Sequence, residues 1–547
     1  MKNSSLLTLP ALFAQTVSKH STRNAMAMVG ETPFTYNDLD LKIRAVMGFL
    51  EKLGLKPGDR VAILSSNMPN WAITYYAIAF SGSIVVPVLP DFNSREIETI
   101  LLHADPKILF ASRSLLEKIK NLPVADSMII IRIEDFSIYH GADPGIKYSP
   151  EGRPAKEYPV KEEDLAAIIY TSGTMGKSKG VMLTHKNICF TAIKGDHIQL
   201  VTERDRFLSI LPLSHTYENT LGMILPMIKG ACIYYLGKAP SSSILMPVLQ
   251  EVRPTVLLSV PLIIEKIYRK SIQPKFERNF FLRYLIRVPF FRKKLNLLAG
   301  KKLMKTFGGE LHFFGIGGAK LNQNVEQFLI EARFPYAIGY GMTEASPLLA
   351  GYNPQHFRLQ STGPALEDTE LKINNPDKIS GEGEIWARGS NVMRGYYKDP
   401  ELTSEIITPE GWLKTGDLGV LDEDGYLYIK GRLKNMIVLS GGENIYPEEI
   451  ESVINNFQHV SDSLVIEQEG KLVALVQFNR AEIEENYSHL QNDFMNFVEM
   501  TIEQLRIELQ RYVNRRVNKF SQLQLVLVQS DPFEKTATMK IKRYLYQ

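Results

Sequence analysis

Two hydrophobic patterns alternate along this chain, and their alternation limits the possible fold more than any other feature of the sequence. Between residues 33 and 160, a helical pattern at 36–54 is followed by β-branched runs at 60–64, 83–89 and 107–111. Strands that alternate with helices are typical of βαβ units, in which helices cover both faces of a mainly parallel sheet. Similar runs recur at 166–172, 207–213, 231–237 and 255–260. We therefore expect an α/β fold with helices layered on mainly parallel sheets.

One uncharged stretch, from Val61 to Pro90, is long enough to raise the question of a membrane span. It is interrupted by Asn67, Pro69 and Gly82, which suit helix boundaries and turns. The pattern is better explained by a buried helix that leads into a buried strand. We expect no transmembrane span here.

The pattern changes towards the C-terminus, which suggests more than one domain in a chain of 547 residues. From about residue 361 the strands become shorter and the turns tighter. After Arg432 the sequence predicts a small α+β unit: a helix at 448–457, a hairpin turning at Glu469-Gly470, a polar helix at 498–516 and a strand at 523–529. We expect a large N-terminal domain at 1–433, made of α/β layers plus a small β-rich part, and a small C-terminal domain at 434–547.

The overall composition excludes several classes of protein. The net charge of +3 is too small to imply a nucleic-acid partner. The two cysteines, Cys189 and Cys232, cannot form a disulfide framework, and the N-terminal apolar run is too short for a secretory signal. A cytoplasmic location is therefore expected.

The segment from Tyr170 to Gly180, directly after a buried strand, has the composition of a phosphate-binding loop. It contains three glycines, the hydroxyls of Thr171, Ser172 and Thr174, and two lysines. Glycines let backbone N–H groups approach an anion closely, while hydroxyls and ammonium groups bind it. The loop is not a Walker A motif, because position 171 holds threonine where that motif requires glycine. Such a loop suits a polyphosphate.

This loop resembles the phosphate loop of the adenylate-forming superfamily, which includes acyl-CoA synthetases, luciferases and peptide-synthetase adenylation domains. Six further segments match that superfamily in the same order: Leu213-Ser214-His215, Gly317-Gly318-Ala319, Tyr340-Gly341-Met342-Thr343-Glu344, Thr415-Gly416-Asp417, Gly431-Arg432-Leu433-Lys434 and Lys540-Ile541-Lys542-Arg543. The resemblance covers nearly the whole chain. It implies ATP-dependent activation of a carboxylic acid as an acyl-adenylate, with release of pyrophosphate, followed by transfer of the acyl group to a thiol.

The resemblance also implies roles for individual residues, with ATP, Mg²⁺ and CoA as cofactors or cosubstrates. Catalysis would rest on Lys540, which bridges the carboxylate and α-phosphate, together with Thr343 at the α-phosphate and Glu344 as the Mg²⁺ ligand. The superfamily usually has glycine before this lysine, whereas this chain has Met539. The nucleotide would be bound by Thr171, Ser172, Gly173, Thr174 and Lys179 at the phosphates, by Gly318, Ala319, Tyr340 and Gly341 at adenine, and by Asp417 and Arg432 at ribose.

Three further positions concern the thiol and acid. Lys434 matches the hinge about which the small domain of superfamily members rotates between the two half-reactions, so the C-terminal domain is expected to be mobile. Gly441 and Gly442 resemble the loop that lines the thiol tunnel. His215 would border the carboxylate of the acid, and its surrounding segment is similar to the long-chain fatty acid branch. The implied function is therefore that of a fatty acid–CoA ligase.

Two alternatives remain open from the sequence: an acyl-ACP synthetase, which transfers to acyl carrier protein, and a catalytically silent nucleotide or lipid sensor. Residues 266–305 hold thirteen lysines and arginines against one glutamate, with aromatic residues between them. A charge run is commonly a solvated face, but this composition also suits a peripheral contact with anionic lipid or with acidic carrier protein.

Overall fold

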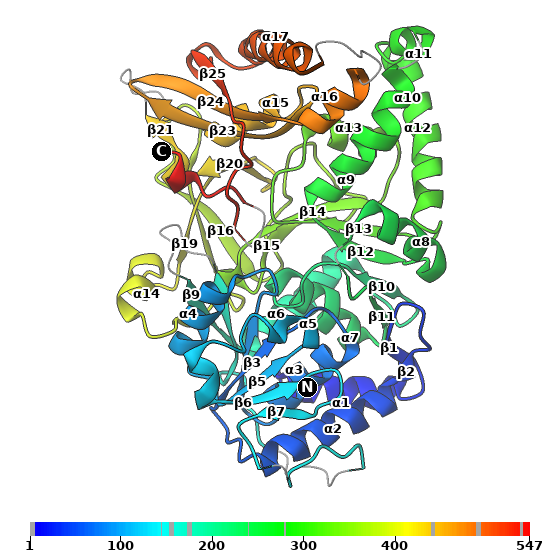
Figure 1. The fold of residues 1–547 in the computed structure, drawn as a ribbon, viewed down its shortest axis with the longest axis vertical. Helices are drawn as coiled ribbons and strands as arrows, with labels where there is room; N and C mark the ends of the chain where they lie inside the picture. Colours follow the sequence, from blue (N-terminus) through cyan, green and yellow to red (C-terminus); the bar gives the residue numbers. More distant parts are fainter. Residues whose placement is uncertain are drawn as a thin grey trace.

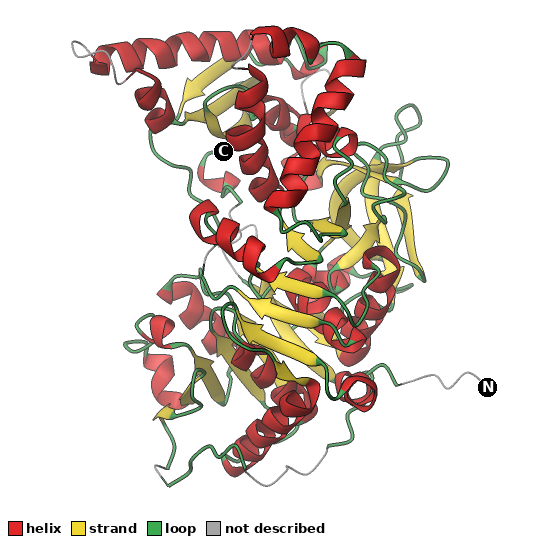
Figure 2. Ribbon diagram, turned by 90° about the vertical axis from the view of Figure 1, so that its right-hand side faces the viewer, coloured by secondary structure: helices red, strands yellow, loops and turns green. Residues whose placement is uncertain are grey.

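The computed structural model describes residues 6–143, 145–151, 158–171, 178–238, 240–277, 280–438, 444–487, 494–536 and 540–547. The chain runs from a large lower body, blue to green in Figure 1, to a smaller upper body in orange and red. Two large sheets form the lower body, and Figure 2 shows their strands between layers of helices. The expected α/β architecture is therefore present.

The first sheet has eight strands, and its five central strands are parallel. In spatial order they are β18 (Gly395–Tyr396), β9 (Lys179–Thr184), β8 (Leu165–Thr171), β4 (Ile84–Val88), β3 (Arg60–Leu64), β5 (Ile108–Ala111), β6 (Ile129–Arg132) and β7 (Ile138–His140). The antiparallel strands lie at its two edges. The buried faces of the central strands explain why their sequences are continuously apolar.

The second sheet also has eight strands, with six of them parallel. Their order is β15 (Leu348–Gly351), β14 (Tyr336–Gly341), β13 (Phe313–Ile316), β12 (Val256–Ser259), β10 (Arg206–Ser209), β11 (Cys232–Tyr235), β1 (Asn24–Met28) and β2 (Phe34–Thr35). A single hydrophobic core contains residues of both sheets, among them Val61 and Phe314.

Helices cover both large sheets. They include α1 (Leu9–His20), α2 (Tyr36–Lys52), α3 (Pro69–Phe80), α4 (Ser94–Ala104), α5 (Arg113–Leu116), α6 (His185–Gln199), the π-helix η2 (Tyr217–Ile224), α7 (Leu225–Lys229), α8 (Ser242–Val252), α13 (Gln323–Glu331) and α14 (Pro400–Ile406). The uncharged stretch forms α3 and β4, both buried, as predicted. Within the described ranges, no helix combines the length and apolar character that crossing a bilayer requires.

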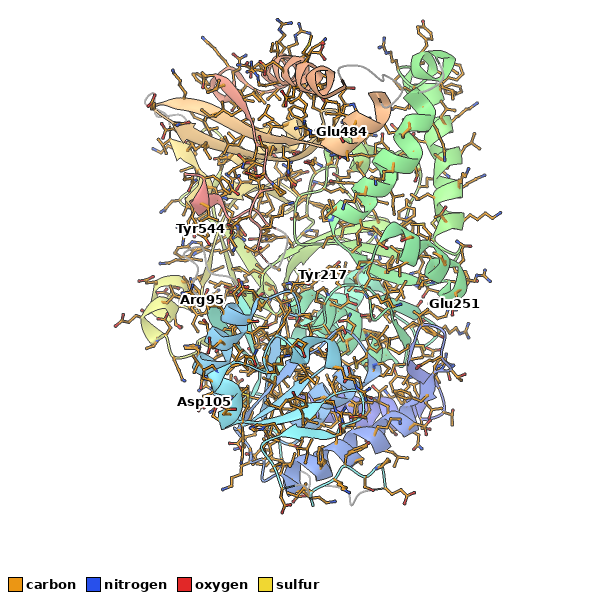
Figure 3. The ribbon with its side chains drawn as sticks, in the orientation of Figure 1. Arg95, Asp105, Tyr217, Glu251, Glu484 and Tyr544 are labelled. Carbon is orange, nitrogen blue, oxygen red and sulfur yellow. The ribbon has the colours of Figure 1, made fainter. Side chains whose placement is uncertain are left out.

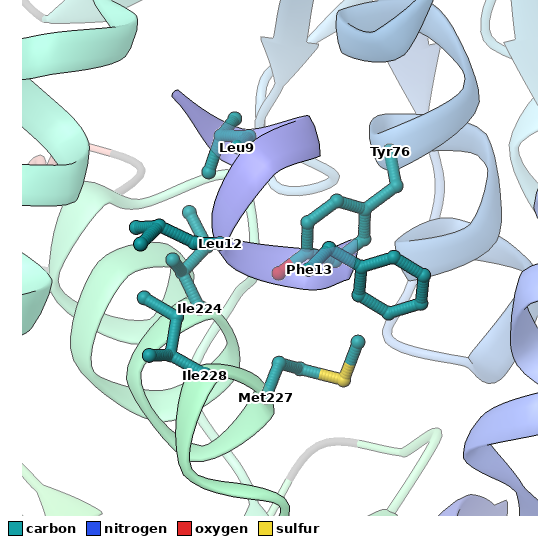
Figure 4. A pocket seen from close by; sticks show the side chains of 7 residues that line it. All are labelled: Leu9, Leu12, Phe13, Tyr76, Ile224, Met227 and Ile228. Carbon is teal, nitrogen blue, oxygen red and sulfur yellow. The ribbon is translucent and has the colours of Figure 1, made fainter. Parts of the chain in front are cut away.

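Helix α1 is fastened to this body by apolar contacts. Leu9, Leu12 and Phe13 of α1 surround a small hollow together with Tyr76 of α3 and three side chains of η2 and α7, namely Ile224, Met227 and Ile228 (Figure 4). All three α1 residues are buried, and the Phe13 and Tyr76 rings lie 5.5 Å apart. Because its lining is almost entirely apolar, this hollow belongs to the packing of α1.

A four-stranded antiparallel sheet follows, made of β16 (Thr369–Asn374), β17 (Gly383–Gly389), β19 (Leu413–Leu421) and β20 (Leu427–Arg432). This is the small β-rich part. The short helix η5 (Leu433–Asn435) leads from β20 into the upper body.

The upper body is an α+β unit with its own hydrophobic core. It contains β21 (Ile437–Val438), β22 (Asn444–Ile445), α15 (Pro447–Ile454), β23 (Val460–Gln468), β24 (Lys471–Phe478), α16 (Arg480–Tyr487), α17 (Phe494–Asn514) and β25 (Leu525–Val528). The predicted hairpin joins β23 to β24, and Glu469 and Gly470 have φ of +52° and +75°, as a tight hairpin turn requires. The boundary at residue 433 stays a prediction.

The basic segment forms a helical arm, which we define as residues 261–306. It comprises α9 (Pro261–Ile267), the π-helix η3 (Tyr268–Ile272), α10 (Gln273–Glu277), α11 (Phe280–Leu285) and α12 (Pro289–Thr306). The arm is inserted between β12 and β13, and in Figure 1 its green helices rise along the right-hand side towards the upper body.

Candidate functional site

The phosphate-loop motif closes a hairpin between β8 and β9. Thr171, the last residue of β8, pairs in antiparallel register with Lys179, the first residue of β9. Ser172, Gly173 and Thr174 lie outside the described residues. The two ends of the motif are thus held by the edge of a buried sheet.

Lys179 is linked to Glu344 through an aromatic residue that the sequence analysis missed. The Lys179 ammonium lies 5.2 Å from the centre of the Tyr396 ring, and the Tyr396 hydroxyl donates a hydrogen bond of 2.8 Å to Oε1 of Glu344. Tyr396 reaches this place because β18 pairs with β9. The sequence analysis missed Tyr396 because its segment, Arg394-Gly395-Tyr396-Tyr397, shows no distinguishing pattern.

Thr343 and Glu344 lie in a short 3₁₀ helix, η4 (Thr343–Ala345), immediately after β14. The turn before it requires glycine, because a Cβ atom at Gly341 would lie 1.7 Å from the carbonyl oxygen of Pro347. Glu344 is buried, and its second carboxylate oxygen has no partner from the described part of the chain. This geometry suits a metal ligand.

The oxygen and nitrogen donors near Glu344 decide whether this site can bind Mg²⁺. Within the described ranges, no group of three or more histidines, cysteines or carboxylates could hold a metal. Mg²⁺ is commonly bound by one or two carboxylates together with substrate phosphates and water. Glu344, next to the Lys179 side of the phosphate loop, fits that mode of binding.

Tyr340 and Arg432 both contact the carboxylate of Asp417, one through a hydrogen bond and the other through a salt bridge. The Tyr340 hydroxyl donates to Oδ2 of Asp417 at 2.8 Å, and Nε of Arg432 lies 3.1 Å from Oδ1 of the same carboxylate. Asp417 on β19 and Arg432 on β20 are direct cross-strand partners. Burial and the Asp417 carboxylate raise the pKa of Tyr340 above its ordinary value, so its hydroxyl remains a donor. Three motifs far apart in sequence therefore meet here.

Gly318 and Ala319 follow β13 and are exposed. Gly318 has a φ of +87°, a conformation that favours glycine. Beside them, the ring of Tyr217 lies close to Gly317, where an added Cβ would meet its Cε1 at 3.2 Å. Figure 3 places Tyr217 near the middle of the molecule, between the lower body and the upper body. An added Cβ at Gly318 would have no atom closer than 4.0 Å, so the space next to this glycine is open.

Lys540 of the upper body lies within electrostatic range of His215, Asp417 and Arg432. Burial, together with the nearby Lys540 ammonium, lowers the pKa of His215 to about 4. Lys540 is an exposed residue, but desolvation of its ammonium group lowers its pKa, as does the Arg432 guanidinium, while the Asp417 carboxylate opposes the shift. The structure thus brings Lys540, His215, Asp417 and Arg432 into one electrostatic neighbourhood.

The remaining predicted residues are placed as follows. Lys434 lies in η5, on the segment between the two bodies, and its side chain is exposed. Gly441 and Gly442 lie outside the described residues. Among the predicted residues that the structure describes, Lys179 is joined to Glu344 through Tyr396, and Tyr340 and Arg432 both contact Asp417. Lys540 interacts electrostatically with His215, Asp417 and Arg432.

Comparison with known proteins decides the family. The sequence profile of the AMP-binding enzyme family matches residues 13–397, and the profile of the AMP-binding enzyme C-terminal domain matches residues 434–546. The chain belongs to the AMP-binding enzyme family. The resemblance to adenylate-forming enzymes and the expected fold class are confirmed.

Relatives of this AMP-binding enzyme include ligases for different acids. Long-chain-fatty-acid–CoA ligase heimdall of Drosophila melanogaster is 27% identical over 525 residues, which cover 86% of this chain and 76% of the relative. A 4-coumarate–CoA ligase of Vanilla planifolia is 30% identical over 487 residues, with 83% and 80% covered. Long-chain-fatty-acid–CoA ligase 1 of Saccharomyces cerevisiae is 29% identical over 480 residues, with 77% and 68% covered.

Solved structures share the fold. An ATP-bound chimera of RpMatB and BxBclM superposes with a TM-score of 0.77 at 24% identity, covering 98% of this chain and 97% of the other. O-succinylbenzoate coenzyme A synthetase of Bacillus subtilis, in complex with AMP, also gives a TM-score of 0.77, at 22% identity and 98% coverage of both chains.

Proposed function

We propose that this AMP-binding enzyme is a fatty acid–CoA ligase that forms an acyl-adenylate from a fatty acid and ATP and then transfers the acyl group to CoA. The observation that supports the proposal is that the Lys540 ammonium lies within electrostatic range of His215 and of the Asp417–Arg432 pair. A cation at that point can stabilise the charge that develops when the carboxylate attacks the α-phosphate. Relatives named for long-chain fatty acids support a fatty acid as the substrate, and relatives named for 4-coumarate make that acid the alternative substrate.

The resemblance to adenylate-forming enzymes suggests a role for each residue of the site. Lys179, Thr171 and the residues between them would hold the β- and γ-phosphates, and Thr343 would contact the α-phosphate. Glu344 would hold Mg²⁺, which would neutralise charge on the phosphates when bound. Gly318, Ala319, Tyr340 and Gly341 would surround adenine. Asp417 accepts hydrogen bonds in the structure and would accept them from the ribose hydroxyls.

His215 would border the carboxylate as a neutral imidazole. With a pKa of about 4 it carries no charge at neutral pH, so it can donate one hydrogen bond and leave the cationic role to Lys540. The C-terminal domain from residue 434, with Lys434 at its hinge and Gly441 and Gly442 beside the thiol, would then present CoA to the adenylate.

The helical arm adds a peripheral membrane contact to the proposal. Several of its large apolar side chains are exposed, including Tyr284 at 66%, Phe290 at 60% and Leu298 at 63%. Exposed lysines and arginines, among them Arg287, Lys293 and Lys302, lie in the same stretch. Aromatic and cationic groups together favour the surface of an anionic bilayer, where a fatty acid partitions.

A panel of acids tests the proposal directly. Purified enzyme is incubated with ATP, Mg²⁺ and acids from acetate to palmitate, with 4-coumarate included, and pyrophosphate release is measured with CoA or acyl carrier protein as acceptor. We expect the highest kcat/KM with a fatty acid and CoA. Preference for 4-coumarate would reject a fatty acid as the substrate, and preference for carrier protein would reject CoA as the acceptor. ATP binding without pyrophosphate release would indicate a sensor.

A further inference from the structure

The carboxyl end of α15 is held against the large body by two side chains. Nη2 of Arg269, at the root of the helical arm, donates a hydrogen bond of 2.5 Å to the backbone carbonyl of Asn455. Next to it, the side-chain amide of Asn322 donates to Oδ1 of Asn456. Both contacts join the body that carries the nucleotide site to the domain that carries Lys540.

The first contact satisfies a general need of helix ends. The last carbonyl groups of a helix have no partner inside the helix, and they carry partial negative charge. Asn455 is the C-cap of α15, so its carbonyl is one of these groups. A guanidinium placed there donates a charge-assisted hydrogen bond and complements the helix dipole.

The second contact is oriented in advance by its surroundings. Oδ1 of Asn322 caps the N-terminus of α13 by accepting from the backbone N–H groups of Asn324 and Val325, which turns its amide N–H₂ group outwards. Nδ2 of Asn456 donates to the carbonyl of Ser452 at 2.9 Å, which leaves its oxygen to accept. The donor and acceptor of this pair are therefore assigned by their other bonds.

Glu265 interacts with both residues of the large body, with Asn322 through its backbone and with Arg269 through its charge. Its Oε1 accepts a hydrogen bond of 3.0 Å from the backbone N–H of Asn322. Burial raises the pKa of Glu265, whereas the Asn322 N–H and the Arg269 guanidinium, one helical turn away, oppose that shift. Arg269 and Asn322 thus form one prearranged surface.

Helix α15 transmits this contact to the catalytic tail. Glu451, one turn before Asn455, pairs with the guanidinium of Arg543 and accepts from the backbone N–H of Val465 at 2.7 Å. Arg543 also donates to the carbonyl of Val465 at 3.1 Å, and it follows Lys540 by three residues. A short run of polar contacts therefore connects Arg269 to the backbone that presents Lys540.

We infer that Arg269 and Asn322 are positioning residues for adenylate formation, which hold the small domain in the pose that brings Lys540 to the α-phosphate. We refer to these two residues as the α15 latch. The inference rests on the proposed function for its chemistry, and it assigns to the root of the helical arm a role in choosing between the two half-reactions.

The two half-reactions are measured separately in Arg269→Gln and Asn322→Asp. The second variant keeps an N-cap acceptor for α13 and removes the amide donor. We expect acyl-adenylate formation to fall about tenfold in each, as the loss of one such hydrogen bond predicts. Thioester formation from supplied acyl-AMP is expected to stay unchanged or to increase. Lys270→Gln, which alters an exposed cation next to Arg269 with no side-chain partner among the described residues, serves as the matched control.

Equal losses in both half-reactions, or no loss in either, would overturn the latch.

A second readout does not depend on the identity of the acid. Cys189 and Cys232 are both buried, so dyes can be attached selectively to Arg204→Cys on the large body and Lys471→Cys on the small domain. With ATP and Mg²⁺ alone, we expect one narrow distance distribution in the parent and a broader or shifted one in Arg269→Gln. Identical distributions would overturn the inference, whatever acid the enzyme uses.

Discussion

The residues proposed to face the nucleotide and the lysine proposed to act in catalysis are supported in opposite ways. Tyr340, Glu344 and Asp417 are buried, and each lies on or directly after a strand of a packed sheet. Lys540 lies in the last ten residues of the sequence, where the backbone N–H of Thr536 donates to the Lys540 carbonyl at 2.7 Å. Lys535 and Ile541 form an isolated antiparallel β-bridge next to it. One group is fixed by the core of the large body, whereas the other depends on where the small domain sits.

This difference suits an enzyme that must perform two reactions on one bound intermediate. Binding groups need a constant geometry, because misplacement of a reacting atom by about 1 Å can cost a large factor in rate. A charge that is needed in one step and obstructive in the next is better carried by a separately packed unit. The upper body has its own core, so it can move without unfolding.

Removing the lysine breaks the comparison most severely. We expect Lys540→Ala to reduce acyl-adenylate formation about 10³-fold, because a charge that acts in the transition state is lost. Thioester formation from supplied acyl-AMP should remain close to that of the parent. Pyrophosphate exchange and single-turnover thioester assays measure the two steps. If both fell together while the circular dichroism spectrum was unchanged, Lys540 would not be specific to the first step.

Glu344→Gln tests the fixed side of the comparison. The amide keeps the shape and can still accept from Tyr396, but it loses the charge that would hold Mg²⁺. We expect kcat for adenylation to fall about 100-fold and the concentration of Mg²⁺ needed for half-maximal rate to rise, with little change in acid binding. Titration of rate against Mg²⁺ measures this effect. An equal loss of acid affinity would instead indicate a structural carboxylate.

The helical arm offers a third comparison, between a cation paired with a buried carboxylate and cations exposed on its surface. Arg292 forms a bidentate pair with the buried Glu331, at 2.8 and 3.1 Å, so its replacement would leave a buried charge unpaired. Arg287, Lys293 and Lys302 are exposed. We expect Gln at these three positions to weaken co-sedimentation with anionic vesicles about tenfold and to spare adenylation of a soluble acid.

Added salt should reproduce that loss, because screening acts over about 8 Å at physiological ionic strength. Unchanged co-sedimentation, with a loss confined to transfer onto acyl carrier protein, would assign the arm to a protein partner. Lys301→Gln alone, as a single-charge control, should produce a smaller loss than the triple variant.

The mildest perturbation is a change of pH. The pKa of Lys540 is lowered in the folded protein, so its ammonium loses its proton at a lower pH than that of an ordinary lysine. Under the proposed role of Lys540, the adenylation rate should fall over the same pH range. Lys540→Arg keeps the positive charge to higher pH. We expect the alkaline fall of the adenylation rate to move upwards by about one pH unit or more, relative to the parent. An unmoved alkaline limb would mean that another group controls it.

The fold was predictable from the sequence because its signals are local. Alternating periodicity and continuous apolar runs identified β3, β4 and β5, helix α2 before them and helix α3 between β3 and β4, and the Glu469-Gly470 turn identified the hairpin of the small domain. The order of strands in the two sheets was not predictable, since it depends on packing between segments more than a hundred residues apart, such as β9 with β18.

The site was predictable as a set of motifs and less so as an arrangement. Tyr340, Asp417 and Arg432 stood out by their resemblance to known motifs, and the structure joins them by a hydrogen bond and a salt bridge. Tyr396 did not stand out, because a tyrosine in a turn-rich segment has no special pattern. The Arg269 contact with Asn455 was equally hidden, because a lone arginine in a basic run resembles its solvated neighbours.

The burial of both cysteines has a consequence for chemistry with thiols. Cys189 is fully buried and Cys232 nearly so, and burial raises the pKa of both thiols, that of Cys232 to about 11. Exchange between a protein cysteine and a disulfide needs an accessible thiolate, which neither residue supplies at neutral pH. An enzyme proposed to bind CoA would thus meet oxidised CoA without forming a mixed disulfide with it, and its activity should survive in the presence of that disulfide.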